Sequence, residues 1–246
     1  MNLEQLENKK IEILEFFKDL SFKEDTHQYF IKDRAVKYSV SGIVKRFEEP
    51  FKKNFMAERV AMSRGISKEE VLIEWKNISK ESLRIGNAAH LFGENYVFDR
   101  SFVPEDGYQR AVAKFWDELP DFIIPVFAEL RCYHKTRFYA GTMDQLLYNT
   151  LNNTFMIGDY KSNKDLFKNY KGKMLTGKFN DLLDTPYNKY QIQLNYYQEL
   201  IEQVPGIKIS KRKIIWIKPD GEYELFDCED YSDRIAKKVK NNLKWN

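Results

Sequence analysis

A carboxylate and an ammonium group lie two positions apart in the segment IGDYKSNK, as Asp159 and Lys161. Residues 153–161 have the composition of a β-strand, in which alternate side chains point to the same face. A carboxylate beside an ammonium can bind a hard cation, orient a water molecule and neutralise the charge of a phosphate. The alternative interpretation is a surface ion pair at a strand end.

A second carboxylate, Asp144, lies on the preceding predicted strand, residues 138–149. If this strand pairs with 153–161 as a hairpin, Asp144 approaches Asp159 at one end of the sheet. Two carboxylates held that close repel each other, and a divalent cation between them removes the repulsion. Gly141, in the interior of the same strand, indicates a close backbone approach or a bulge. The alternative for Asp144 is an aspartate that caps a turn.

Two earlier segments contribute a histidine and further carboxylates. In GNAAHLFGENYV, Gly86, His90 and Glu94 are spaced four residues apart and would share one face of a helix over 79–98. A single histidine on a helix is more often structural than a metal ligand. Glu129 lies on a predicted strand, where it would either complete a carboxylate cluster or pair with a neighbouring basic side chain.

The segment after the predicted strand 153–161, about 162–187, is rich in lysine and asparagine and is too long for a simple connection. Lysine provides mobile charges suited to phosphate contacts that do not depend on base sequence, although a lysine-rich stretch is often only a solvated surface. Six lysines lie between positions 161 and 178: Lys161, Lys164, Lys168, Lys171, Lys173 and Lys178. The C-terminus is predicted to be a basic helix that carries Lys237, Lys238, Lys240 and Lys244.

A helix is predicted over 187–203, directly after this basic segment. Gln193 and Tyr197 lie one turn apart on it, and Tyr190 belongs to the same stripe as Tyr197. A glutamine amide and a tyrosine hydroxyl can hold a phosphate or a base. The alternative is an amphipathic helix whose tyrosines pack against the core.

The composition is that of a soluble globular protein of 246 residues, with 43% hydrophobic and 31% charged residues. The net charge of +3 provides no strong overall field for nucleic acid. The two cysteines, Cys132 and Cys228, provide neither a zinc motif nor the four ligands of an iron–sulfur cluster. The sequence shows no apolar run near the roughly 20 residues that span a bilayer, no signal peptide and no P-loop. We therefore expect a cytoplasmic protein without membrane association.

The overall pattern predicts a mainly helical first half and an α/β second half. Helices are expected at 3–20, from Ser39 or Ser41 to Phe47, and at 51–63, 67–77, 79–98, 105–119 and 187–203. Strands are expected in a hairpin at 21–39 and at 122–132, 138–149, 153–161, 211–218 and 222–228.

The order of the motifs is more specific than any one of them. A helix with G-x-x-x-H-x-x-x-E, a strand with glutamate, and then G-T-x-D, D-Y-K and Q-L-x-x-Y resemble the PD-(D/E)XK nuclease superfamily. The resemblance is greatest to its RecB-type exonuclease branch, in particular the mitochondrial genome maintenance exonuclease and phage exonucleases, and it covers roughly residues 84–217. The matching residues are Gly86, His90, Glu94, Glu129, Gly141, Asp144, Asp159, Lys161, Gln193 and Tyr197.

The resemblance implies a three-layer, restriction-endonuclease-like α/β core with a mixed central sheet flanked by helices. The groups expected to hold one or two Mg²⁺ or Mn²⁺ ions are His90, Asp144, Asp159 and the backbone carbonyl of Tyr160. The residues expected to take part in catalysis are Lys161, Asp159, Asp144 and Glu129. The residues expected to contact or steady the DNA are Glu94, Lys164, Lys168, Lys171, Lys173, Tyr190, Gln193 and Tyr197.

On this basis we expect a mainly helical N-terminal extension, 1–80, that covers the active-site face. A nuclease core, 81–246, would follow, with a lysine-rich insertion at about 162–187. The expected activity is metal-dependent DNA exonuclease action on single strands, in replication, recombination or repair. Plentiful aromatic residues suit stacking on bases, and no base-reading module is recognisable. The alternatives are a structure-specific endonuclease on the same core, a non-catalytic nucleic-acid-binding protein, and a structural protein whose motif match is coincidental.

Overall fold

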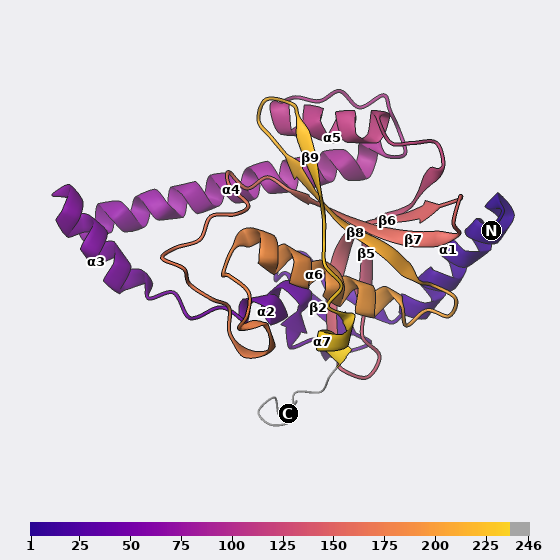
Figure 1. Ribbon diagram of the computed structural model, residues 1–246, viewed down its shortest axis with the longest axis horizontal. Coiled ribbons are helices and arrows are strands. Elements are labelled where there is room, and N and C mark those ends of the chain that lie inside the picture. Colours follow the sequence, from indigo (N-terminus) through magenta and orange to yellow (C-terminus); the bar gives the residue numbers. More distant parts are fainter. Residues whose placement is uncertain (237–246) are drawn as a thin grey trace.

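The computed structural model, described over residues 1–236, has a mixed β-sheet at its centre with helices against both faces (Figure 1). Its strands are β4 (Tyr38–Ser39), β5 (Ile123–Tyr133), β6 (Tyr139–Asn149), β7 (Thr154–Lys161), β8 (Ile209–Ile217) and β9 (Tyr223–Asp227). They are hydrogen-bonded in the order β4, β6, β7, β8, β9, and β5 pairs with β6. The β4–β6 and β7–β8 pairs are parallel and the others antiparallel, so the expected α/β class with a mixed sheet is confirmed.

Two hydrophobic clusters lie on opposite faces of this sheet. Adjacent residues Ile214 and Ile215 of β8 belong to different clusters because strand side chains alternate between faces. One cluster includes side chains of α4 (Lys68–Tyr96) and α5 (Gly107–Asp117). The larger one includes side chains of α1 (Leu3–Phe17), α2 (Val40–Lys45), α6 (Pro186–Ile201) and α7 (Ser232–Ala236).

The starts of the helices follow from side chains that satisfy free backbone N–H groups. Ser39, one of the two expected capping residues, accepts a hydrogen bond from Gly42 N at 3.0 Å and so caps α2, which begins at Val40. Ser67 accepts from Glu70 N at 3.1 Å, and the Glu70 carboxylate accepts from Ser67 N at 2.7 Å. This capping box fixes the start of α4.

Strands β6 and β7 form the expected hairpin, and their regular pairing ends at Gln145 and Gly158. Beyond this point β7 continues to pair with β8, whereas the first residues of β6 pair with β4. Asp144 and Asp159 are the next residues after the last pair. The hairpin therefore presents both carboxylates where the two strands part.

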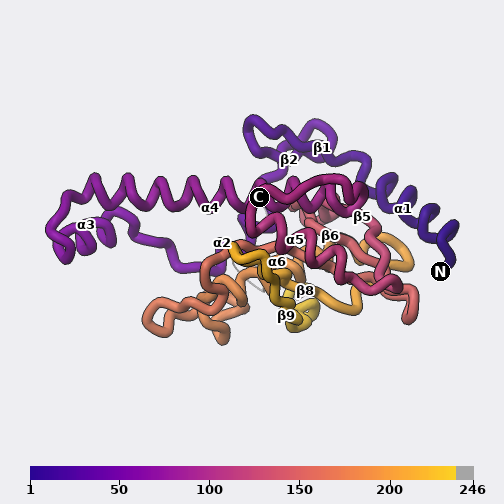
Figure 2. The backbone as a smooth tube through the Cα atoms, turned by 90° about the horizontal axis from the view of Figure 1, so that it is seen from above, coloured from indigo at the N-terminus to yellow at the C-terminus, as the bar shows by residue number. Residues whose placement is uncertain are grey.

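The N-terminal residues share a hydrophobic core with the residues that follow the expected boundary at 80/81. Leu6 and Ile13 of α1 and Val40 of α2 are buried in the same core as β6 and α6. Strand β4 belongs to the central sheet, and α4 crosses the expected boundary without a break. A small sheet lies beside β5, apart from the central sheet (Figure 2), and consists of β1 (Leu20–Lys23), β2 (Gln28–Ile31) and β3 (Arg34–Ala35).

Helix α4 is one continuous helix where two were expected, at 67–77 and 79–98. The segment that joins them, residues 76–84, contains neither Pro nor Gly, so no residue interrupts the helical hydrogen bonds. These nine residues are all exposed, and this part of α4 projects from the sheet with α3 (Lys53–Arg64) at its end (Figures 1 and 2).

The lysine-rich segment is a folded loop that is anchored to the core. Leu166, Leu175 and Phe179 are at most 2% exposed and belong to the larger hydrophobic cluster. Thr176 N donates a hydrogen bond to the carbonyl of Phe47 at 2.7 Å. The loop therefore has a defined shape, with a short 3₁₀ turn (η1, Gly177–Phe179) inside it.

The expected basic C-terminal helix begins at Ser232 as α7. Its lysines, Lys237, Lys238, Lys240 and Lys244, lie outside the described residues. Among the described helices, none combines the length and the apolar composition that crossing a bilayer requires.

Candidate metal centre

Three carboxylates lie side by side on neighbouring strands. The β5–β6 pairing on either side of Glu129 places it opposite Asp144, and the β6–β7 pairing places Asp144 next to Asp159. Tyr160 N donates a hydrogen bond to Asp144 Oδ2 at 2.9 Å, which holds this carboxylate across the gap between the parting strands. The approach of Asp144 to Asp159 that the sequence predicts is thus present.

The backbone of Glu129 is in the left-handed region, with a φ of 52°. This conformation is uncommon for a non-glycine residue and costs about 1 kcal/mol or more. The residues before and after it pair regularly with β6, so the strand continues through the irregularity. The surrounding sheet therefore holds a strained residue in place, and that residue carries one of the three carboxylates.

Helix α4 places His90 beside two of the carboxylates. His90 Nδ1 lies 3.3 Å from Glu129 Oε1 and 3.3 Å from Asp144 Oδ2. Ligand atoms of the three residues all lie within 4.8 Å of one another. Burial lowers the pKa of His90, but the Asp144 charge and the hydrogen bond to Glu129 outweigh this effect and raise it to about 9.

Asp159 and Lys161 form an ion pair, with Lys161 Nζ 2.5 Å from Asp159 Oδ2. The two side chains therefore share a face, as their spacing predicts. Asp159 is fully buried, and neither of its oxygens has a well-directed hydrogen bond from the described residues. Burial, followed by the charge of Asp144, raises the pKa of Asp159 to about 7, although Lys161 opposes the shift.

The donor set fits a divalent cation such as Mg²⁺ or Mn²⁺. His90, Glu129 and Asp144 present one nitrogen and two carboxylates to a common point. The buried Asp159 carboxylate has the Lys161 ion pair, but within residues 1–236 it accepts none of the well-directed hydrogen bonds that a buried carboxylate normally has. A cation between Asp144 and Asp159 would supply that partner and offset their repulsion. None of these residues is a cysteine, so the group offers no thiolate ligand.

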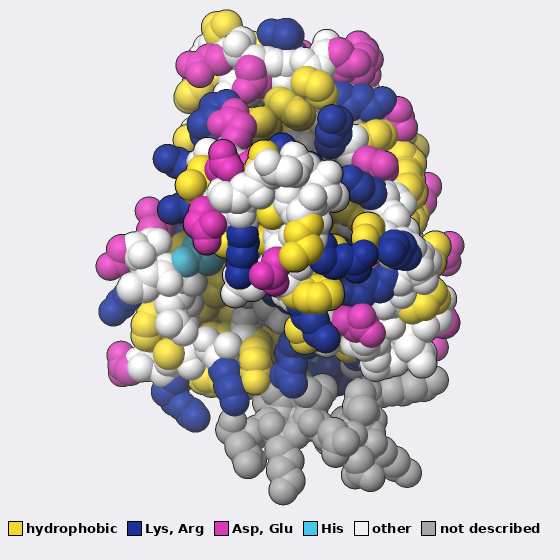
Figure 3. Space-filling model, turned by 90° about the vertical axis from the view of Figure 1, so that its left-hand side faces the viewer, with side chains coloured by type: hydrophobic (Ala, Val, Ile, Leu, Met, Phe, Trp, Pro, Cys, Tyr) yellow, Lys and Arg dark blue, Asp and Glu magenta, His cyan; other side chains and the backbone are white. Residues whose placement is uncertain are grey.

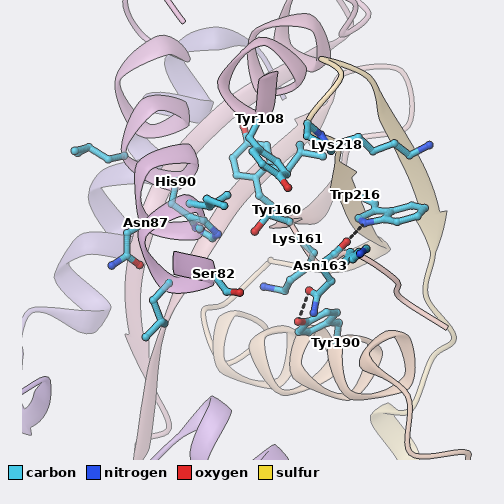
Figure 4. Close-up of a pocket in the computed structure, with 18 of the residues that line it drawn as sticks. Ser82, Asn87, His90, Tyr108, Tyr160, Lys161, Asn163, Tyr190, Trp216 and Lys218 are labelled. Atoms are coloured by element: carbon cyan, nitrogen blue, oxygen red, sulfur yellow. Dashed lines mark hydrogen bonds between the residues drawn. The ribbon is translucent and has the colours of Figure 1, made fainter. Parts of the chain in front are cut away.

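Three residues of this set, His90, Glu129 and Lys161, line an open cleft of about 1220 Å³ between α4, the end of β7 and the β8–β9 turn (Figure 4). Lys161 enters this cleft with its ammonium 4.7 Å from the ring centre of Tyr190 on α6. Asn163 links the two sides, because Tyr190 Oη donates to its side-chain oxygen at 2.5 Å and Trp216 Nε1 donates to its carbonyl at 2.6 Å. Charged, amide and aromatic groups thus converge on this one cleft.

Sequence reasoning missed several residues of this cleft. Asn163, Trp216, Tyr108 and Lys218 all line it. The one available signal was that Asn163 continues the motif that contains Lys161. Trp216 could not be found from spacing, because it reaches the cleft through the parallel pairing of β7 with β8, where it lies opposite Lys161.

The expected DNA-contacting residues separate into two groups. Glu94, Lys164 and Tyr190 line the cleft, as do Gly86 and His90, for which no DNA contact was expected. The other lysines lie further along the loop. Lys168 lines a second hollow, Lys171 lies 5.5 Å from the ring centre of Tyr170, and Lys173 forms ion pairs with Glu49 and Asp184.

Gln193 and Tyr197 are not among the residues that line the cleft. Tyr197 is 5% exposed and packs against Gly141, where a Cβ atom would lie 2.7 Å from the tyrosine ring. The Tyr197 side chain therefore belongs to the core, and its expected role of steadying the active site and the DNA beside it stays a prediction. The expected close backbone approach at Gly141 is correct, and Tyr197 is the group that approaches. Gln193 Nε2 lies 3.5 Å from the Tyr197 hydroxyl.

Comparison with known proteins returns no matching family model and no matching curated relative.

Proposed function

We propose that this protein is a metal-dependent nuclease that hydrolyses phosphodiester bonds in DNA, on a restriction-endonuclease-like core. The observation that carries the proposal is the convergence of His90, Glu129 and Asp144 within 4.8 Å, next to the buried Asp159–Lys161 pair. His90, Glu129 and Lys161 line the cleft, with Asp144 and Asp159 beside them. This set of groups suits phosphoryl chemistry better than a structural role, for which a buried carboxylate such as Asp159 is costly.

A bound divalent cation would polarise the phosphate and lower the pKa of a water molecule. Asp144 and Asp159 would hold the cation, with His90 or Glu129 completing its ligands, and the Tyr160 N–H keeps Asp144 oriented. Lys161, anchored by Asp159, directs its ammonium at the position where negative charge accumulates on the phosphate. Because Lys161 is held by an ion pair and by the Tyr190 ring, little reorganisation is needed during the reaction.

The preferred substrate in this proposal is a single DNA strand that is digested from an end. The cleft is open to solvent and lined by Tyr190, Trp216 and Tyr108, whose rings can contact unpaired bases. The described part of the chain shows no helix-turn-helix or zinc module that would read a duplex.

The test uses labelled linear single strands, linear duplex and circular single strands, with Mg²⁺, Mn²⁺ or EDTA. Three variants accompany the wild type: Asp159→Ala, Asp144→Asn and the control Asp33→Asn, which changes an exposed aspartate in the N-terminal hairpin. Asp144→Asn retains an oxygen that can accept from Tyr160 N, so its fold should be unchanged. Circular dichroism checks this directly.

We expect metal-dependent shortening of linear strands by wild type and Asp33→Asn, and a loss of about 100-fold or more in the site variants. If circular strands are cleaved, the protein is still a nuclease, but it acts as an endonuclease and requires no strand end. If wild type binds strands but hydrolyses none with either metal, the catalytic proposal is wrong and the alternative of a binding protein takes its place.

A further inference from the structure

A second hollow of about 770 Å³ adjoins the cleft. Asn163 and Lys164 line both, so the two form one continuous path along the surface. The second hollow lies over the lysine-rich loop and the start of α6. Its lining is Asn163, Lys164, Asp165, Lys168, Tyr170, Asp184, Pro186 and Lys189.

The positive charges of this hollow are only partly neutralised. Lys189 is paired with Asp184 at 3.1 Å and with Glu48 at 3.5 Å. Lys164 and Lys168 are exposed and have no ion-pair or hydrogen-bond partner within residues 1–236. Asp165, the nearest acid in the sequence, accepts a hydrogen bond from Phe167 N at 2.8 Å. Figure 3 shows Lys and Arg side chains gathered around a hollow on this side of the molecule.

The loop that carries these lysines is held in a fixed shape. Asn169 Nδ2 donates to the carbonyls of Lys173 and Asp184, at 2.8 and 3.0 Å, and joins the two ends of a short hairpin. Asp184 N donates to Lys173 O at 2.8 Å. Tyr170 stands on the rim with its side chain 59% exposed. Unpaired ammonium groups and an accessible ring are thus presented on a preorganised surface, which lowers the entropic cost of binding.

We propose that this second hollow is a subsite for the nucleic-acid strand, in which Lys164 and Lys168 hold backbone phosphates and Tyr170 stacks on a base. The inference rests on the proposed function, because it extends the path of the strand beyond the reacting phosphate. Single-stranded DNA is the ligand chemistry that matches, since it presents a series of phosphates together with unpaired bases.

The test measures binding in EDTA, so it does not depend on hydrolysis. Fluorescein-labelled oligothymidylates of about 4 and about 20 nucleotides are titrated with wild type, Lys164→Ala/Lys168→Ala and Tyr170→Leu, at several salt concentrations. The control is Lys32→Ala, another exposed lysine whose side chain lies on the N-terminal hairpin. Melting temperatures confirm that each variant is folded.

We expect the double lysine variant to bind the long strand at least about fivefold more weakly, with a smaller change for the short one. The slope of log Kd against log salt should fall by about 0.7 for each lost phosphate contact, so by about 1.4. Tyr170→Leu should weaken binding without changing this slope, because it removes stacking but no charge. Lys32→Ala should behave as wild type.

Two results would overturn the inference while leaving the proposed function intact. The first is a salt slope in the double variant equal to that of Lys32→Ala. The second is an equal loss of affinity for short and long strands, which places the lysines at the reacting phosphate and not beyond it. A wild-type protein that binds neither strand at low salt would instead contradict the proposed function itself.

Discussion

The backbone of Gly93 packs directly against the ring of Tyr160, so closely that a Cβ atom at position 93 would lie 2.8 Å from Tyr160 Cε2. This contact sets the distance between α4, which carries His90, and β7, which carries Asp159. We predict that Gly93→Ala forces the helix and the strand apart, destabilises the fold by about 1–3 kcal/mol and weakens metal binding. Urea denaturation and Mg²⁺-induced changes in melting temperature measure the two effects.

Gly86, about two turns earlier on the same helix, is the matched control. A Cβ atom there would lie 3.8 Å from Ser162 Oγ, which is an ordinary contact. Gly86→Ala should therefore stabilise the protein by up to about 1 kcal/mol, because alanine favours the helix. If both alanine variants behave alike, the close contact at Gly93 does not determine the helix position.

The pH dependence of metal binding follows from the raised pKa values of Asp159, about 7, and His90, about 9. In the metal-free protein, the stability that protonated Asp159 contributes is present below its ordinary pKa of 3.8 and is lost as pH rises through about 7. The contribution of protonated His90 is likewise present below 6.5 and lost as pH rises through about 9. A cation needs the carboxylate and the neutral imidazole, so it displaces protons from both.

We therefore expect the Mg²⁺-induced rise in melting temperature to increase between pH 6 and pH 8.5. In Asp159→Asn, which mimics the protonated side chain, the metal-free stability should fall less between pH 5 and 8 than in wild type. Thermal unfolding with Mg²⁺ or with EDTA across this pH range measures both quantities. A Mg²⁺ effect that does not vary with pH would show that neither group is a ligand.

Residues whose place is determined by local spacing could be predicted from the sequence. Residues whose place is determined by tertiary packing could not. The spacing of Asp159 and Lys161 on a strand, and a hairpin that joins their strand to Asp144, follow from strand periodicity and were found in the sequence. The burial of Tyr197 depends on the approach of α6 to Gly141, a contact between distant segments that helical periodicity does not encode. The single core that side chains from both sides of the expected boundary at 80/81 fill is likewise a result of contacts between distant segments.

The exposed middle of α4, residues 76–84, should open far more often than the rest of the helix. Its hydrogen bonds have no tertiary packing around them, whereas Ala89, Phe92 and Tyr96 are buried against the core. We predict fast amide hydrogen exchange over 76–84 and strong protection over 89–96, although the two belong to one helix. Exchange followed by mass spectrometry resolves these segments. Uniform protection along α4 would mean that another part of the protein or another molecule covers its middle.

Two substitutions at Glu129, whose backbone is left-handed, separate the effect of removing its carboxylate from the effect of relieving its backbone strain. Glycine adopts a φ of 52° without strain, whereas alanine does not. Both Glu129→Gly and Glu129→Ala remove the carboxylate beside His90, so both should lose a similar part of the Mg²⁺-induced stabilisation. Without metal, the glycine variant should be the more stable by about 1 kcal/mol, because only it relieves the strain.

Urea denaturation in EDTA compares the two variants, and melting with and without Mg²⁺ tests the metal. Equal stability of the glycine and alanine variants would mean that the backbone at position 129 is not held in the left-handed region. Full Mg²⁺ stabilisation of either variant would remove Glu129 from the ligand set and leave His90 and the two aspartates as the centre. If both variants lose Mg²⁺-induced stabilisation and the glycine variant is also the more stable without metal, the sheet holds Glu129 under strain because its carboxylate is needed at the metal.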